Sequence, residues 1–227
     1  MARRPRFADS VFINCPFDKD YWPLLEAIVF CVVDCGFTPR SALEASDAGE
    51  ARINKICRLV GQSQYGIHDI SRIELGAESL LPRFNMPFEL GLDFGAKTFG
   101  TTQQKRKQLL VLDAKPYRYQ ASISDIAGQD IRVHNNSPDE VINVVRHWLM
   151  AASRRRNVPP VSAIRRHFIE FGLALPQLCD ENQIDRDDIQ FVEYVALAVS
   201  WLTASSTQSS MRKLTSVAAV KGDEVPG

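Results

Sequence analysis

A glutamate inside an apolar stretch is the residue of this sequence that most suggests catalysis. Glu89 follows Pro87 and Phe88 and precedes Leu90 and Gly91. Because proline suits the first turn of a helix, the pattern predicts Glu89 in such a turn. A carboxylate near a helix N-terminus is stabilised as the anion by the helix dipole and the free backbone amides. We therefore expect a fixed, ionised carboxylate here, and the alternative is that Glu89 only caps its own helix.

Two polar clusters at the ends of apolar, strand-like runs are the next candidates. One run covers residues 10–15 and the other covers residues 65–70. Polar groups are costly to bury without purpose, and parallel sheets bind ligands at the carboxyl ends of their strands. The residues that we expect to contact a ligand are Asn14, Pro16, Phe17, Asp18, Asp69, Ser71, Arg72 and, just before the glutamate helix, Asn85.

The side chains of these clusters suit a phosphorylated sugar. Asn14 and Asp18 can hold the hydroxyls of a ribose, although Asp18 fits a helix cap equally well and Asp20 fits a cap better. The guanidinium of Arg72 forms a two-donor fork that matches a phosphate. We interpret His68 as a histidine satisfied at the sheet edge and not as a ligand contact.

Alternating strand-like and helix-like patterns position these residues. We expect strands at 10–15, 37–42, 65–70, 108–113 and 130–134, and helices at 21–33, 51–62, 87–97 and 137–152. Such alternation predicts an α/β fold, a parallel sheet of about five strands with helices on both faces. In the glutamate helix, the small residues Gly91 and Gly95 should allow close approach to the sheet. We expect the packing face of this helix to consist of Phe88, Leu92, Gly95 and Ala96.

The strand signal stops after the first two thirds of the chain. We expect an α/β domain over residues 1–152 and a helical appendage over residues 153–227, which packs on the core or on another subunit. The appendage should contain helices at 161–175 and 189–202, an acidic turn at 179–182 and a tail that frays from Ala204.

The charge balance limits the class of partner. The 27 basic and 27 acidic side chains give a formal net charge of zero, which disfavours a general nucleic-acid binder. We interpret residues 105–107 as a solvated basic loop. The arginines at 154–156 follow a helix and interact favourably with its C-terminal dipole. Together with the arginines at 165–166 they could also contact nucleic acid.

No membrane span or metal site is expected. The apolar run 24–33 is shorter than the ~20 residues that a spanning helix needs. The 5 cysteines have no CxxC spacing, which indicates reduced thiols in a cytoplasmic protein. The 4 histidines are scattered without metal-ligand spacing.

The motifs together resemble a known group of domains. A strand with a polar end, a strand ending in Asp69 and Ser71, and a helix carrying Phe88-Glu89-Leu90-Gly91 resemble the TIR-like and nucleoside 2-deoxyribosyltransferase-like domains. The resemblance covers residues 10–115 by topology. It departs from the TIR pattern just before the glutamate, where serine, tryptophan and cysteine usually stand. In the deoxyribosyltransferase pattern an aspartate closely precedes the glutamate helix, whereas here the loop 73–84 intervenes. The substrate therefore stays open.

The resemblance implies a flavodoxin-like fold and an N-glycosidase that cleaves the base–ribose bond of NAD or a related nucleotide. Glu89 would be the catalytic carboxylate, Asp69 and Ser71 would lie beside the ribose, and residues 14–18 would line the pocket. The nucleotide is the substrate, and no cofactor or metal is implied. Bacterial relatives of this kind act as effectors in antiphage defence, so a homo-oligomer or an assembly with defence partners is expected.

Two other functions fit the same residues. The cleft of a nucleotide sensor would bind its signal without cleaving it, and the appendage would transmit the bound state. An adaptor would contact nucleic acid or a partner protein through the basic segments. The glycosidase chemistry also agrees with the residues themselves, because one carboxylate can stabilise an oxocarbenium-like sugar or form a glycosyl intermediate.

Overall fold

The computed structural model describes residues 5–44, 49–72, 83–121 and 123–221, with the backbone alone for 208–221. Its centre is a parallel sheet with the order β2-β1-β3-β4-β5, which is a flavodoxin-like order. The strands are β1 (Ser10–Asn14), β2 (Thr38–Arg40), β3 (Tyr65–Asp69), β4 (Gln108–Asp113) and β5 (Arg132–Val133). The helices are α1 (Trp22–Asp34), α2 (Arg52–Gln62), α3 (Asn85–Phe99), α4 (Pro138–Ser153), α5 (Val161–Asn182) and α6 (Phe191–Lys221). The predicted α/β fold class is confirmed.

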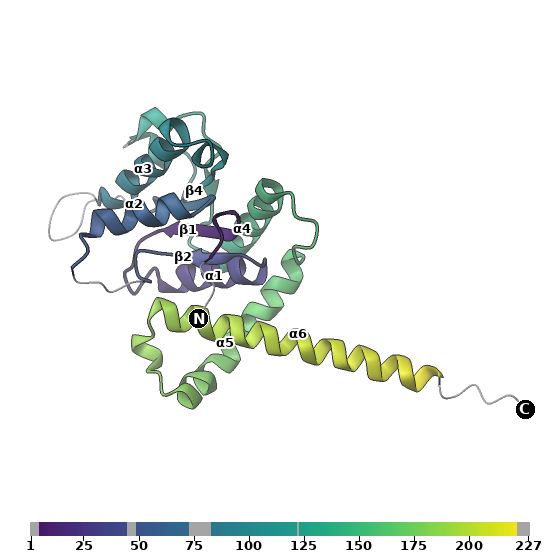
Figure 1. Ribbon diagram of the computed structural model, residues 1–227. Coiled ribbons are helices and arrows are strands. Elements are labelled where there is room, and N and C mark those ends of the chain that lie inside the picture. Colours follow the sequence, from purple (N-terminus) through teal and green to yellow (C-terminus); the bar gives the residue numbers. More distant parts are fainter. Residues whose placement is uncertain (1–4, 45–48, 73–82, 122, 222–227) are drawn as a thin grey trace, which may run out of the picture.

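Helices cover both faces of the sheet. Helices α1 and α4 lie against one face, and α2 and α3 lie against the other (Figure 1). Val11 and Ile13 of β1 join the hydrophobic cluster of α1 and α4. Phe12, between them in sequence, packs with Ile56 and Leu59 of α2. This period-two alternation is what a strand buried on both faces requires.

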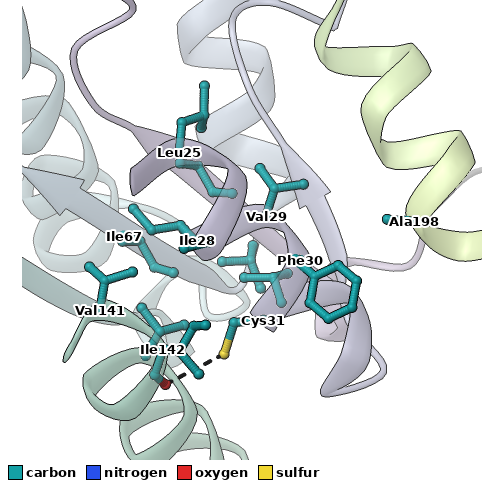
Figure 2. Packing of buried hydrophobic residues seen from close by; sticks show 14 of the residues in the cluster. Leu25, Ile28, Val29, Phe30, Cys31, Ile67, Val141, Ile142 and Ala198 are labelled. Carbon is teal, nitrogen blue, oxygen red and sulfur yellow. Dashed lines mark hydrogen bonds between the residues drawn. The ribbon is translucent and has the colours of Figure 1, made fainter. Parts of the chain in front are cut away.

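Helix α1 is apolar on almost all sides because it lies between the sheet and the C-terminal helices. Figure 2 shows Cys31 beside Ile142 of α4, where the thiol donates to the Ile142 carbonyl oxygen at 3.6 Å. On the outer side, the ring of Phe30 stacks on Phe171 of α5 with 5.1 Å between the ring centroids. The appendage therefore packs on the α/β core through α1.

The C-terminal helices are longer than the sequence pattern predicts. Helix α5 continues to Asn182, so the expected acidic turn is its last turn. Helix α6 continues to Lys221, past the point where fraying was expected, and its second half projects from the body (Figure 1). Threonine, which often favours loops, makes hydrogen bonds inside α6. The Thr203 hydroxyl donates to the Val199 carbonyl oxygen at 2.7 Å, and the Thr207 hydroxyl donates to the Thr203 carbonyl oxygen at 3.0 Å.

The expected packing of α3 is partly wrong. Phe88 is 57% exposed, and the ideal Cβ positions of Gly91 and Gly95 meet no atom within 4 Å. The buried positions of this helix are instead Met86, Glu89, Leu90 and Asp93. Helix α3 begins two residues earlier than predicted, and the face that it turns to the sheet is set by tertiary packing.

Two arginines of the segments considered for nucleic-acid contact are paired within the chain. Arg155 forms an ion pair with Asp9, and its guanidinium lies 3.9 Å from the ring centroid of Phe37. Arg165 forms an ion pair with Asp139 of α4. These contacts hold the appendage, from its first residues on, to the α/β core.

All 5 cysteines have free thiols, and of these only Cys57 is exposed. Within the described ranges, no helix has the length and apolarity needed to cross a bilayer.

Candidate active site

A cavity of about 420 Å³ lies beyond the carboxyl end of β1, against the N-termini of α2 and α3. Its position is the one at which parallel sheets bind ligands. The residues that line it are Asn14, Cys15, Pro16, Phe17, Asp18, Arg52, Arg83, Asn85, Met86 and Glu89. The structure thus brings together the sequence-predicted site residues of the first strand end and of the glutamate helix.

Glu89 lies in the second turn of α3, because the helix begins at Asn85. No acidic side chain occupies the first turn and no side chain caps this helix, so the cap alternative is wrong. The glutamate is only 4% exposed. Among the described residues, none donates a hydrogen bond to its carboxyl group.

The environment of Glu89 favours its neutral form. Burial raises the pKa of Glu89 from 4.5 to about 7, and the positive charge of Arg52 offsets a small part of this rise. The distance from the Arg52 Nη2 atom to Glu89 Oε1 is 4.0 Å, longer than a hydrogen bond. The expectation of a fully ionised carboxylate is therefore wrong, since its protonated and ionised forms are comparably populated near pH 7.

Two arginines at the cavity were missed by the sequence reasoning. Arg52 opens α2, and Arg83, which precedes α3, donates from Nη1 to Asp18 Oδ2 at 2.9 Å. Their side chains are 58% and 55% exposed, so both guanidinium groups can reach a ligand. The helix dipole disfavours a cation in the first turn, and this local conflict is the signal that could have identified Arg52.

Asp18 lies both at the start of α1 and at the cavity, and its contact with a ribose stays a prediction. Its Oδ1 atom accepts a hydrogen bond from the backbone N–H of Tyr21, the residue before α1, at 3.0 Å, and the residue also lines the cavity. Asp20 is exposed and makes no such bond among the described residues, so the expected cap at that position is wrong.

Asp69, Ser71 and Arg72 do not line this cavity. Asp69 is fully buried, and it accepts a hydrogen bond from the Tyr21 hydroxyl at 2.5 Å and lies 3.0 Å from His134 Nε2. Burial acts to raise the pKa of Asp69, but the contacts from His134, Ser71 and Tyr21 outweigh it and hold that pKa below its usual value. Asp69 therefore ties the ends of β3, α1 and β5 together.

His68 points to the opposite side of β3 from Asp69, as the strand alternation requires. It is fully buried, with its two ring nitrogens 3.1 Å from Asn14 Nδ2 and 3.0 Å from Asp93 Oδ2. The prediction of a satisfied histidine is confirmed, but it lies on the central strand of the sheet and not at the edge.

No group of three side chains suited to a metal ion occurs within the described ranges. Comparisons of the chain with protein-family models, curated proteins and solved structures gave no match. The geometry of the site combines a buried carboxyl group of raised pKa, two exposed arginines and a side-chain amide around one cavity.

Proposed function

We propose that the protein is an N-glycosidase that cleaves the base–ribose bond of NAD or a related nucleotide, with Glu89 as the catalytic carboxylate. One observation carries the proposal: Glu89 is buried in a cavity at the strand ends, makes no hydrogen bond to the described residues and has a pKa of about 7. A desolvated carboxyl group that titrates near neutral pH is typical of catalytic positions.

The chemistry needs one such group. When the bond between the sugar C1′ and the base nitrogen breaks, the electron pair leaves with the base and positive charge develops on the sugar. An ionised Glu89 beside C1′ would stabilise that charge, and its weak solvation makes the interaction stronger than in water. Water then adds to C1′. With a pyridinium nucleotide the base leaves neutral, and the proton of the water passes to Glu89 and on to solvent.

The other lining residues suit the remaining parts of a nucleotide. Arg52 and Arg83 flank the glutamate and present exposed guanidinium groups, which bind phosphate through paired donors. Asn14 supplies a polar contact for the sugar. The apolar side chains of Phe17 and Met86 offer a surface for the flat base.

The cellular setting belongs to the same proposal. We place the protein in the cytoplasm, as an antiphage-defence effector that works as a homo-oligomer or with partners of its defence system. The free thiols of all 5 cysteines support a reducing compartment. The resemblance to TIR-like and deoxyribosyltransferase-like domains supports the defence role.

The test is a screen for released base. Wild-type protein is incubated with NAD, with nucleosides and with nucleotides, and free base is separated by chromatography. We expect release by the wild type and by the control Glu170→Gln, which changes an exposed glutamate of α5, but not by Glu89→Gln. Tight nucleotide binding without release of base would instead support the sensor function.

A further inference from the structure

A chain of buried polar side chains leads from the sheet interior to the cavity. Lys107 Nζ lies 3.0 Å from Asp93 Oδ1, and Asp93 Oδ2 lies 3.0 Å from His68 Nε2. His68 Nδ1 lies 3.1 Å from Nδ2 of Asn14, which lines the cavity. Lys107, Asp93 and His68 are fully buried and Asn14 is 2% exposed, although Lys107 belongs to a segment that the sequence indicated to be solvated. Buried groups of this kind are costly unless each has a partner.

The ammonium group of Lys107 anchors the inner end of this series of side chains. It donates to the Val60 carbonyl oxygen at 2.7 Å and to the Ser63 carbonyl oxygen, and it pairs with Asp93. The two donated hydrogen bonds fix the ammonium group, and its charge lies 3.0 Å from Asp93 Oδ1. Burial lowers the pKa of Lys107, and Asp93 opposes that shift. One carboxylate oxygen of Asp93 therefore faces the ammonium group, and the other faces His68 Nε2.

The hydrogen bonds of the Asn14 amide group follow from its partners. The atom of Asn14 that faces His68 Nδ1 is the amide nitrogen, which can only donate, so Nδ1 accepts and the ring proton belongs on Nε2, toward Asp93 Oδ2. Asn14 Nδ2 donates to this nitrogen and also to the Met86 carbonyl oxygen at 2.9 Å. A backbone carbonyl can only accept, so the atom facing it is the amide nitrogen. Both amide hydrogens are used, and the Asn14 amide oxygen remains as the polar atom available to the cavity.

We propose that the Asn14 amide oxygen accepts a hydrogen bond from a sugar hydroxyl, and that His68, Asp93 and Lys107 are positioning residues that hold this oxygen toward the ligand. The site is thereby selective for a sugar that carries the hydroxyl over its deoxy form. This inference rests on the proposed nucleotide substrate, and it goes further by naming the atom that distinguishes the sugars.

A glycine on β3 leaves space for these buried side chains. Gly66, two residues before His68 on β3, has no side chain, and an ideal Cβ there would lie 2.5 Å from Asp93 Oδ2 and 2.8 Å from His68 Nε2. Real Cβ atoms essentially never come so close to another heavy atom. The glycine thus admits the Asp93 carboxylate above the sheet, which is the close approach that the sequence reasoning had assigned to Gly91 and Gly95.

The first test reads the proton position on His68 without any ligand. In the ¹⁵N-labelled full chain, two-bond ¹⁵N–¹H spectra distinguish the two imidazole nitrogens, and His68→Gln assigns the signals. We expect the proton on Nε2 and an unprotonated Nδ1, and the exposed His147 serves as the reference for a ring outside this cluster. A proton on Nδ1 would turn the Asn14 amide oxygen toward His68 and overturn the positioning chain.

The second test measures sugar selectivity by calorimetry with AMP, 2′-deoxy-AMP and 3′-deoxy-AMP. A Glu89→Gln background prevents turnover. We expect AMP to bind about tenfold more tightly than one deoxy form, the effect of one lost hydrogen bond. Asn14→Ala should remove this ratio, and His68→Gln should reduce it while circular dichroism shows a folded chain.

The outcomes separate the inference from the proposed function. An unchanged ratio in Asn14→Ala would overturn the role of the amide oxygen even if base release depends on Glu89. Absence of binding by all three probes would also overturn it, and would count against a nucleotide substrate. Base release is a separate readout, so a failed glycosidase assay with an intact AMP preference would overturn only the proposed reaction.

Discussion

The Glu89 carboxyl group and the Arg52 guanidinium lie 4.0 Å apart, close enough for attraction but too far for a hydrogen bond. Glu89 is buried and Arg52 is largely exposed. Solvent screens the arginine, so its charge does not compensate the lost hydration of the carboxyl group. The result is a carboxyl group whose pKa of about 7 leaves it available for chemistry instead of being committed to a stable ion pair.

The first prediction concerns the pH dependence of base release. If ionised Glu89 stabilises the transition state, kcat/KM should rise as the pH increases through about 7, because the anionic fraction increases there. Removal of the cation in Arg52→Gln should move the midpoint to higher pH. The control Arg132→Gln, which changes an exposed arginine paired with Asp130, should leave it in place. A flat profile between pH 5.5 and pH 8.5 would contradict the ionised role.

The second prediction concerns stability. The pKa of Glu89 is higher in the folded protein than its ordinary value of 4.5, so stability is lost as the pH rises from about 4.5 through about 7. We expect Glu89→Gln to be more stable than the wild type at pH 8, on the order of 2 kcal/mol, and nearly equal to it at pH 5. Urea denaturation at the two pH values measures the difference. A variant less stable than the wild type at pH 8 would show that the carboxylate is well solvated or well paired.

The third prediction concerns ligand phosphate. Arg83 is exposed at the cavity and is held near it by Asp18. Arg83→Ala should weaken nucleotide binding by about tenfold or more, since charge-assisted hydrogen bonds contribute about 1.5–3 kcal/mol. Isothermal calorimetry with AMP and with adenosine separates the phosphate contribution from the rest. Equal losses for AMP and adenosine would show that Arg83 does not contact the phosphate.

The fourth prediction uses two glycines as a matched pair. Gly66→Ala would place a Cβ 2.5 Å from the Asp93 carboxylate, and we expect a loss of about 1–3 kcal/mol of stability. Gly91→Ala, on an exposed and unobstructed position of α3, should instead stabilise by up to about 1 kcal/mol. Thermal melting of both variants measures this contrast, and equal melting temperatures would contradict the described packing around Asp93.

The order of elements could be predicted because hydrophobic periodicity reports it directly. The apolar run at β4 and the capped start of α4, where Ser137 accepts from the Glu140 amide, both lie where the sequence indicates. Strand alternation also predicts that His68 and Asp69 face opposite sides of β3. It does not tell which side holds the cavity, and Asp69 therefore proved to be a structural anchor.

The long-range pairings could not be predicted in the same way. Lys107 stands beside two other basic residues, so local composition indicates solvent exposure, whereas its partner Asp93 comes from another element. Likewise, the pKa of Glu89 depends on burial by residues distant in sequence and not on its place in the helix. Such properties arise from tertiary packing, which periodicity does not encode.

The most direct test of the central claim is the rate of nicotinamide release from NAD at pH 8 by wild-type protein and by Glu89→Gln. The substitution keeps the size of the side chain and removes its charge. We expect a loss of about 10²-fold or more in kcat, with Glu170→Gln unchanged and the fold of both variants retained. Equal rates in the wild type and Glu89→Gln would contradict it.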